Sequence, residues 1–163
     1  MPAEPHQTNS VSAPLIIGWR ELVALPEWGI RAIKTKVDTG ARTSAIHVDN
    51  IEELPDGRVR FDVIVKLGCG DDAAHSVTVE TEVQRITRVR PSTGKIQRRL
   101  VVTTHMRIGP VERKIELSLV SRHGMICRML LGRRALRGDF LIDPSATRLL
   151  SGQSDRLTRR HKP

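Results

Sequence analysis

The chain has 163 residues, a formal charge of +9 at pH 7, and only 2% aromatic residues, with no tyrosine. A chain of this length fits one domain with a sizeable core, which must be built mainly from aliphatic side chains. The positive charge would suit nucleic acid or an acidic substrate. However, the sequence offers few aromatic stacking platforms and no basic recognition helix or finger motif, and this argues against nucleic-acid binding.

The sequence also argues against a membrane or secreted protein. No apolar run approaches the roughly 18–20 residues of a membrane span. The first 13 residues lack both the basic start and the apolar core of a secretory signal. We therefore expect a cytoplasmic protein that does not enter the membrane, with Cys69 and Cys127 as thiols.

A single folded domain is expected over residues 14–150. Residues 1–13 and 151–163 are poor in apolar residues and are predicted to be disordered tails, of which the C-terminal one is basic. Between the tails, apolar and polar residues alternate in short runs, separated by turn signals such as Leu54-Pro55-Asp56-Gly57. This pattern, with one late helical stretch at residues 133–137, predicts an all-β barrel or sandwich.

The most informative motif is Val37-Asp38-Thr39-Gly40-Ala41, which follows a β-patterned run over residues 30–37. An acid at a strand end, followed by a small hydroxyl residue and a glycine, can present its carboxylate on a tight, hydrogen-bonded loop. Aspartic proteases hold their catalytic carboxylates in Asp-Thr-Gly or Asp-Ser-Gly loops of this kind. The tripeptide also occurs in ordinary turns, so it needs support from elsewhere in the chain.

A long hairpin is predicted from residues 77–90 and 95–108, with its tip at Ser92-Thr93-Gly94. At about 3.3 Å per residue each arm could span roughly 45 Å, so the ribbon must bend or project beyond the rest of the sheet. The segment from 57 to 75 is interpreted as an insertion that precedes this hairpin.

A second motif, Leu130-Leu131-Gly132-Arg133, lies near the end of the predicted domain. It resembles the hydrophobic-hydrophobic-Gly-Arg element of retropepsins, the single-lobed aspartic proteases. Within that type, residues 15–150 resemble a bacterial family once labelled "ATP-dependent zinc protease" and associated with RimK-type ligases. The other matching positions are Trp19-Arg20-Glu21, residues 37–47, Ser92-Thr93-Gly94 and Arg98-Arg99. The resemblance implies a closed barrel with a flap hairpin, in which Gly132 and Arg133 support the site.

The chemistry of an aspartic protease requires two carboxylates that share one proton. The chain has a single Asp-Thr-Gly, because the other candidate, the dipeptide Asp56-Gly57, is a hairpin turn without the hydroxyl. A complete site would therefore need two copies of Asp38, which predicts a homodimer with the site on its two-fold axis. Thr39 would brace the two loops through its hydroxyl, and Gly40 would allow close backbone approach.

Several residues around this loop are expected to contact substrate. The resemblance places Ala41 and the flap residues Ser92, Thr93 and Gly94 against a bound peptide. Arg98, Arg99 and Arg133 are either solvated strand residues or a carboxylate clamp for an acidic peptide. Arg42 occupies the place of an acid that pairs with the Gly-Arg arginine in retroviral enzymes, so Arg133 needs another partner. The candidates are Asp49, Asp139 and Asp143.

Other classes of function are less well supported. His-Glu-x-x-His and Cys-x-x-Cys motifs and a phosphate-binding glycine loop are missing from the sequence, so we expect no metal and no cofactor. We expect an aspartic endopeptidase-like hydrolase that acts on peptides. The alternative is a catalytically weak peptide-binding or regulatory partner of a RimK-type, ATP-dependent ligase.

Overall fold

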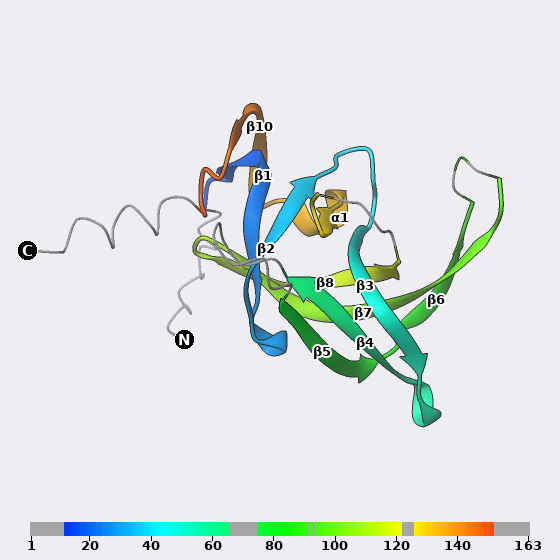
Figure 1. Cartoon of the computed structure of the whole chain (residues 1–163). Helices are drawn as coiled ribbons and strands as arrows, with labels where there is room; N and C mark the ends of the chain where they lie inside the picture. The colour runs from blue at the N-terminus through cyan, green and yellow to red at the C-terminus, as the bar shows by residue number, and fades with distance from the viewer. Residues whose placement is uncertain (1–11, 66–74, 91, 93, 122–125, 152–163) are drawn as a thin grey trace, which may run out of the picture.

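The computed structural model describes residues 12–65, 75–90, 92, 94–121 and 126–151. These residues form ten strands, two 3-10 turns and one short α-helix (Figure 1). The elements are, in chain order, β1 (Leu15–Leu25), η1 (Pro26–Trp28), β2 (Ile30–Val37), β3 (Ser44–Glu53), η2 (Pro55–Gly57), β4 (Arg58–Val65), β5 (His75–Glu82), β6 (Arg85–Val89), β7 (Gln97–Ile108), β8 (Val111–Val120), β9 (Met129–Leu131), α1 (Arg133–Leu136) and β10 (Phe140–Thr147). The predicted all-β class with one late short helix is confirmed.

The strands belong to one sheet, in the order β10-β1-β2-β9-β3-β8-β7-β6, with β4 added to β3 and β5 added to β4. A single bridge between Ala24 and Arg107 also joins β1 to β7, so the sheet curls back on itself. The strand order has two ends, β10 and β6, so closure of the sheet into a barrel depends on this single bridge and stays a prediction.

The predicted long hairpin is wrong in its pairing. The arm over residues 77–90 is divided: β5 pairs along β4, and only β6 pairs with the first part of β7, whose remaining residues pair with β8. The break falls where the Val83 N–H donates to the Gly57 carbonyl and the Gln84 N–H donates to the Val101 carbonyl. The N–H groups of two successive residues thus donate to segments that are far apart in the sequence. The β6/β7 end still projects from the body, as Figure 1 shows.

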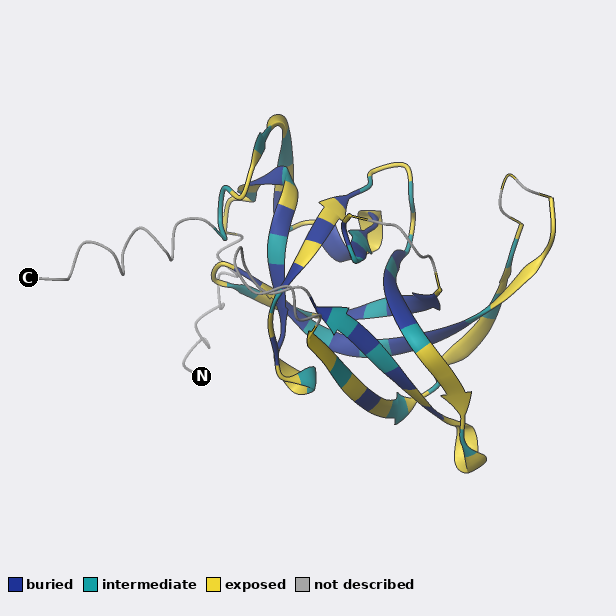
Figure 2. Cartoon of the chain, in the orientation of Figure 1, coloured by how far each residue is buried: buried dark blue, intermediate teal, exposed yellow. Residues whose placement is uncertain are grey.

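The core is aliphatic and follows from strict alternation. In β4, Val59, Phe61 and Val63 are fully buried while the residues between them are more exposed. Phe61 packs edge-on against Trp28, with ring centroids 5.5 Å apart. Figure 2 shows buried residues along the inner faces of the sheet and mostly exposed residues on the projecting hairpin.

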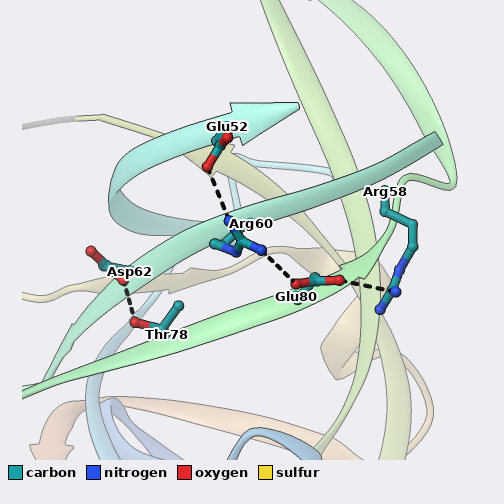
Figure 3. Close-up of polar contacts among 6 residues, drawn as sticks. All are labelled: Glu52, Arg58, Arg60, Asp62, Thr78 and Glu80. Atoms are coloured by element: carbon teal, nitrogen blue, oxygen red, sulfur yellow. Dashed lines mark hydrogen bonds and ion pairs between the residues drawn. The ribbon is translucent and has the colours of Figure 1, made fainter. Parts of the chain in front are cut away.

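The outer face of the β3–β4–β5 addition carries a ladder of charged side chains (Figure 3). Arg60 lies 3.3 Å from Glu52 and 3.2 Å from Glu80, and Arg58 lies 2.9 Å from Glu80. Hydrogen bonds from Asn50 and Thr78 lower the pKa of Asp62. Charges on and beside the edge strand β5 discourage another strand from pairing there.

Two predictions fall largely outside the described residues. The tails at 1–13 and 151–163 are described only at residues 12, 13 and 151, and Cys69 is not described. Ser151, which we assigned to the tail, hydrogen-bonds to Glu21. Cys127 is a buried free thiol. The described part of the chain contains no helix that is long and apolar enough to cross a membrane.

Candidate active site

The Asp38 turn lies between β2 and β3, as the sequence predicted. The Gly40 N–H donates to the Asp38 carboxylate at 3.0 Å, and the Ala41 N–H donates to the Asp38 carbonyl at 3.2 Å. The Asp38 N–H donates to the Leu131 carbonyl at 2.9 Å, which ties the start of the turn to β9. Asp38 is partly exposed, whereas Thr39 and Gly40 are exposed. The carboxylate is therefore oriented by the backbone and open to solvent.

The second motif packs directly against the segment that follows this turn. β2 and β9 run in parallel, with Val37 opposite Leu131, so the two motifs leave the sheet side by side. The Arg133 N–H then donates to the Ala41 carbonyl at 2.9 Å. The Gly132 N–H donates to the buried Ser44 hydroxyl at 3.0 Å. These hydrogen bonds join the Gly132-Arg133 element to residues about 90 positions earlier in the sequence, directly after the Asp38 turn.

Gly132 fits here because it has no side chain. A Cβ at this position would lie 2.6 Å from the Thr43 carbonyl oxygen and 2.7 Å from its carbon, both backbone atoms. We expect Gly132→Ala to lower the free energy of unfolding by about 3 kcal/mol, because a backbone overlap cannot be relieved by a rotamer change. Chemical denaturation measures this loss. Gly94→Ala is the control, since its Cβ would meet no atom within 4 Å and only the φ of +84° would strain it. A smaller loss in Gly132→Ala than in the control would contradict this packing.

The partner of Arg133 differs from all three candidates. Its guanidinium donates to the Thr39 carbonyl at 2.9 Å. The proposed acids are engaged elsewhere: Asp139 pairs with Arg113, Asp143 accepts hydrogen bonds from Ser145, and Asp49 lies 3.7 Å from the His47 ring. Arg133 thus supports the Asp-Thr-Gly turn through a main-chain oxygen, a partner that residue identity cannot reveal.

A cavity of about 330 Å³ lies between the segment after the Asp38 turn and the base of the projecting hairpin. Ala41, Thr43, Ser44 and Ala45 line one side, and residues of β6 and β7 line the other. We had predicted two of its lining residues, Ala41 and Arg99. Three further lining residues were not predicted: His47 of β3, Ser118 of β8, and Arg128, which precedes β9.

The arginines of the hairpin have different surroundings. Arg99 lines the cavity, whereas the guanidinium of the neighbouring Arg98 forms two hydrogen bonds with the Glu53 carboxylate. This pairing lowers the pKa of the exposed Glu53. Arg85, which also lines the cavity, lies 2.8 Å from Glu116. The structure therefore brings Arg99 to the cavity and leaves Arg98 outside it.

The tip of the hairpin is only partly described. Ser92 and Gly94 are exposed at its end, and Thr93 lies outside the described residues. Gly94 has a φ of +84°, a conformation that favours glycine in a tight turn. Among the described residues, no group of three or more His, Cys, Asp or Glu side chains is placed to hold a metal ion.

Glu21, from the Trp19-Arg20-Glu21 motif, is a buried carboxylate of β1 and lies opposite Thr35 of β2, three residues before Asp38. Its oxygens accept hydrogen bonds from the N–H groups of Gly18 and Leu149, both at 2.8 Å, and from the N–H and hydroxyl of Ser151 at 3.2 and 2.6 Å. Glu21 thus fastens the segment after β10 onto β1. The motif could be recognised in the sequence, but the sequence did not indicate which residues Glu21 holds together.

A curled β-sheet with a projecting hairpin, and with one Asp-Thr-Gly turn locked against a Gly-Arg element, defines the class of single-lobed, aspartic-protease-like domains. A family model described as "RimB-like: Retropepsin-like aspartic endopeptidase RimB" matches residues 16–152. The chain belongs to this family, and the resemblance noted from the motifs is confirmed.

Curated relatives carry a different name. Proteins named "Probable alpha-L-glutamate ligase" are 34% identical over 140 residues in Shewanella halifaxensis and 36% identical over 144 residues in Desulfotalea psychrophila. These matches cover 86% and 82% of this chain, but only 31% and 29% of the relatives. The chain therefore spans about a third of the length of the relatives that it matches.

A solved structure has the same fold. A protein of unknown function from Legionella pneumophila superposes with a TM-score of 0.68 and 26% sequence identity. The match covers 85% of this chain and 99% of the Legionella chain. The likeness supports the family assignment and does not extend to an activity.

Proposed function

We propose that the protein is an aspartic endopeptidase whose site is assembled from the Asp38 turns of two protomers. The observation that carries this proposal is the turn itself: a solvent-open carboxylate, held by the Gly40 N–H, on a loop locked by Gly132 and Arg133. Membership of a family described as a retropepsin-like aspartic endopeptidase supports the same reading.

The chemistry follows from one proton shared by two carboxylates. The ionised Asp38 takes a proton from a water molecule, whose oxygen attacks the peptide carbonyl carbon. The protonated Asp38 gives its proton to the carbonyl oxygen, forming a neutral gem-diol. Proton transfer to the amide nitrogen then allows the C–N bond to break, which releases a carboxylic acid and an amine. A single Asp38 cannot act as both base and acid at once.

An exposed apolar pair supports a homodimer. Ile16 and Leu141 lie opposite each other on β1 and β10, and they are 54% and 57% exposed. β10 is an end strand among the strands that the structure describes, and we infer that its outer edge and this apolar pair meet a second copy of the chain. We propose that dimerisation at this edge brings the two Asp38 turns together.

A mixing experiment tests the shared site directly. An excess of the Asp38→Asn chain added to a fixed amount of wild type should suppress peptide cleavage, because wild-type protomers are drawn into heterodimers with one acid. At a fourfold excess and equal affinities, random pairing leaves about one fifth of the wild-type protomers in active dimers. Asp56→Asn chains, added in the same excess, should not reduce the rate. A cleavage rate unaffected by the Asp38→Asn chain, in a mixture shown to exchange subunits, would refute the two-chain site.

We further propose that the substrate is a peptide with acidic side chains. The cavity beside the Asp38 turn is lined by Arg99, by Arg128 and by the buried Ser118. A guanidinium and a hydroxyl can both donate to a carboxylate. The Arg128 side chain has no ion pair within the described part of the chain, and this leaves it available to a ligand.

Removal of one cavity charge should therefore change specificity. We expect Arg128→Gln to lower kcat/KM for peptides with Glu near the cleaved bond by about 10–100-fold, since a charge-assisted hydrogen bond contributes about 1.5–3 kcal/mol. Peptides with Gln at the same position should lose much less. Arg58→Gln, which removes a charge from the β4–β5 ladder, is the matched control. Equal losses for the Glu and Gln peptides would contradict an acidic-residue pocket.

A second candidate function is a peptide-binding or regulatory partner of a RimK-type ligase. The observation in its favour is that relatives named probable alpha-L-glutamate ligase contain a region similar to this chain within a polypeptide about three times as long. A partnership with a glutamate ligase would also suit the acidic peptide that we propose as the ligand of the cavity. This function would survive Asp38→Asn, whereas peptide hydrolysis would not.

A further inference from the structure

A second polar cavity lies beside strands β1 and β2. It has a volume of about 310 Å³ and is lined by parts of β1 and β2, by Cys127, and by Thr147 and Arg148 at the end of β10. It shares no lining residue with the cavity beside the Asp38 turn. In Figure 1, β1, β2 and β10 lie on the opposite side of the view from the projecting β6/β7 hairpin.

Three cationic side chains surround this second cavity: Arg20, Lys34 and Arg148. None of them forms an ion pair within the described part of the chain. The guanidinium of Arg20 lies 4.3 Å from the centre of the Trp19 ring, so it is stacked rather than paired with an acid. Three unpaired cations around one hollow repel one another, and an anion in the hollow would remove that cost.

The one carboxylate in the lining does not neutralise them. Glu21 is 2% exposed, and both its oxygens already accept hydrogen bonds from backbone N–H groups or from Ser151. It therefore forms part of the wall and leaves the three cations free to face the hollow.

The backbone holds two of the cations in fixed positions. Arg148 adopts a φ of +53°, which is uncommon for a residue other than glycine, and its N–H donates to the Arg20 carbonyl at 2.8 Å. This hydrogen bond places Arg148 beside Arg20 across adjacent strands. Two guanidinium groups and an ammonium group provide both forked and single donors, a combination that suits an oxyanion with several charged oxygens.

We propose that the cavity formed by Arg20, Lys34 and Arg148 binds a small polyvalent oxyanion, either a phosphate or a polycarboxylate. The site is separate from the proposed peptide cleft and does not depend on hydrolysis by Asp38. The competing explanation is that the three cations only balance the buried charge of Glu21 at longer range. The two explanations differ in whether an added anion binds.

Calorimetric titration of the full chain with inorganic phosphate, pyrophosphate and citrate, at constant ionic strength, tests the proposal. We expect saturable binding of at least one of them with a Kd below about 1 mM. At ten times that Kd, Tm should rise by about 3–6 °C. Preference for pyrophosphate over citrate would identify a phosphate-bearing ligand, and the reverse would identify a polycarboxylate.

Two double variants distinguish anion binding at this site from binding to positive charges elsewhere on the protein. The double variant Lys34→Gln/Arg148→Gln should weaken binding at least about tenfold, whereas Arg31→Gln/Arg107→Gln, which removes two charges outside the cavity, should not. Asp38→Asn should bind the anion as wild type does, so failure of the proteolytic mechanism would leave this result intact. The proposal is overturned if wild type shows no saturation up to about 10 mM of any of the three anions. It is also overturned if the Lys34/Arg148 double variant binds within twofold of wild type.

Discussion

Replacement of Asp38 by Asn is expected to abolish peptide cleavage while leaving the fold intact. An amide can neither take the proton from water nor give a proton to the carbonyl oxygen, so kcat should fall by at least about 10³-fold. The fold should persist because Asn retains a side-chain oxygen that can accept the Gly40 N–H now bound to Asp38. Cleavage of a peptide library and the Tm of both proteins measure the two effects.

Asp56→Asn provides the matched control for this change. Asp56 is the acid of the other Asp-Gly sequence, it is exposed in η2, and its φ of +68° is one that Asn tolerates. The control should cleave peptides at the wild-type rate. If Asp38→Asn also cleaves at the wild-type rate, the aspartic mechanism fails. If neither wild type nor variant cleaves but both bind the same peptides, the regulatory function is favoured.

Replacement of Glu21 by Ala is expected to give the largest loss of stability. It would remove the acceptor from three backbone N–H groups, those of Gly18, Leu149 and Ser151, around a site that is 2% exposed. Buried donors without partners cost about 1–3 kcal/mol each. We expect the free energy of unfolding to fall by about 4 kcal/mol, which corresponds to a drop in Tm of about 8–16 °C.

Two comparisons make this test specific. Glu21→Gln keeps one acceptor oxygen and should lose less than Glu21→Ala. Glu112→Ala removes an exposed glutamate of β8 and should change the free energy of unfolding by less than about 0.5 kcal/mol. Equal effects of Glu21→Ala and Glu112→Ala in chemical denaturation would mean that Glu21 does not hold the segment after β10 in solution.

Local patterns determined much of the fold. Alternation with a period of two is a property of neighbouring residues, so it predicted the β-rich class. The structure shows this period in β4, where Phe61 is buried and its neighbours Arg60 and Asp62 are more exposed. Asp38-Thr39-Gly40 and Leu131-Gly132-Arg133 could be recognised because each motif depends on residue types at adjacent positions. The order of the two motifs also indicated the family, which the match over residues 16–152 confirms.

Only the tertiary structure decided which segments meet. Alternation says which side of a strand is buried but not which strand lies beside it, so the transfer of pairing from β4 to β7 at Val83 and Gln84 was missed. The sequence likewise could not predict that the Thr39 carbonyl accepts a hydrogen bond from Arg133, or which backbone N–H groups donate to Glu21. Main-chain partners carry no residue-specific signal, and, apart from the Gly18 N–H, these contacts span about 90 to 130 positions. The cavity arginines and the Arg20–Lys34–Arg148 cluster likewise arise from strands that the sheet, not the local sequence, brings together.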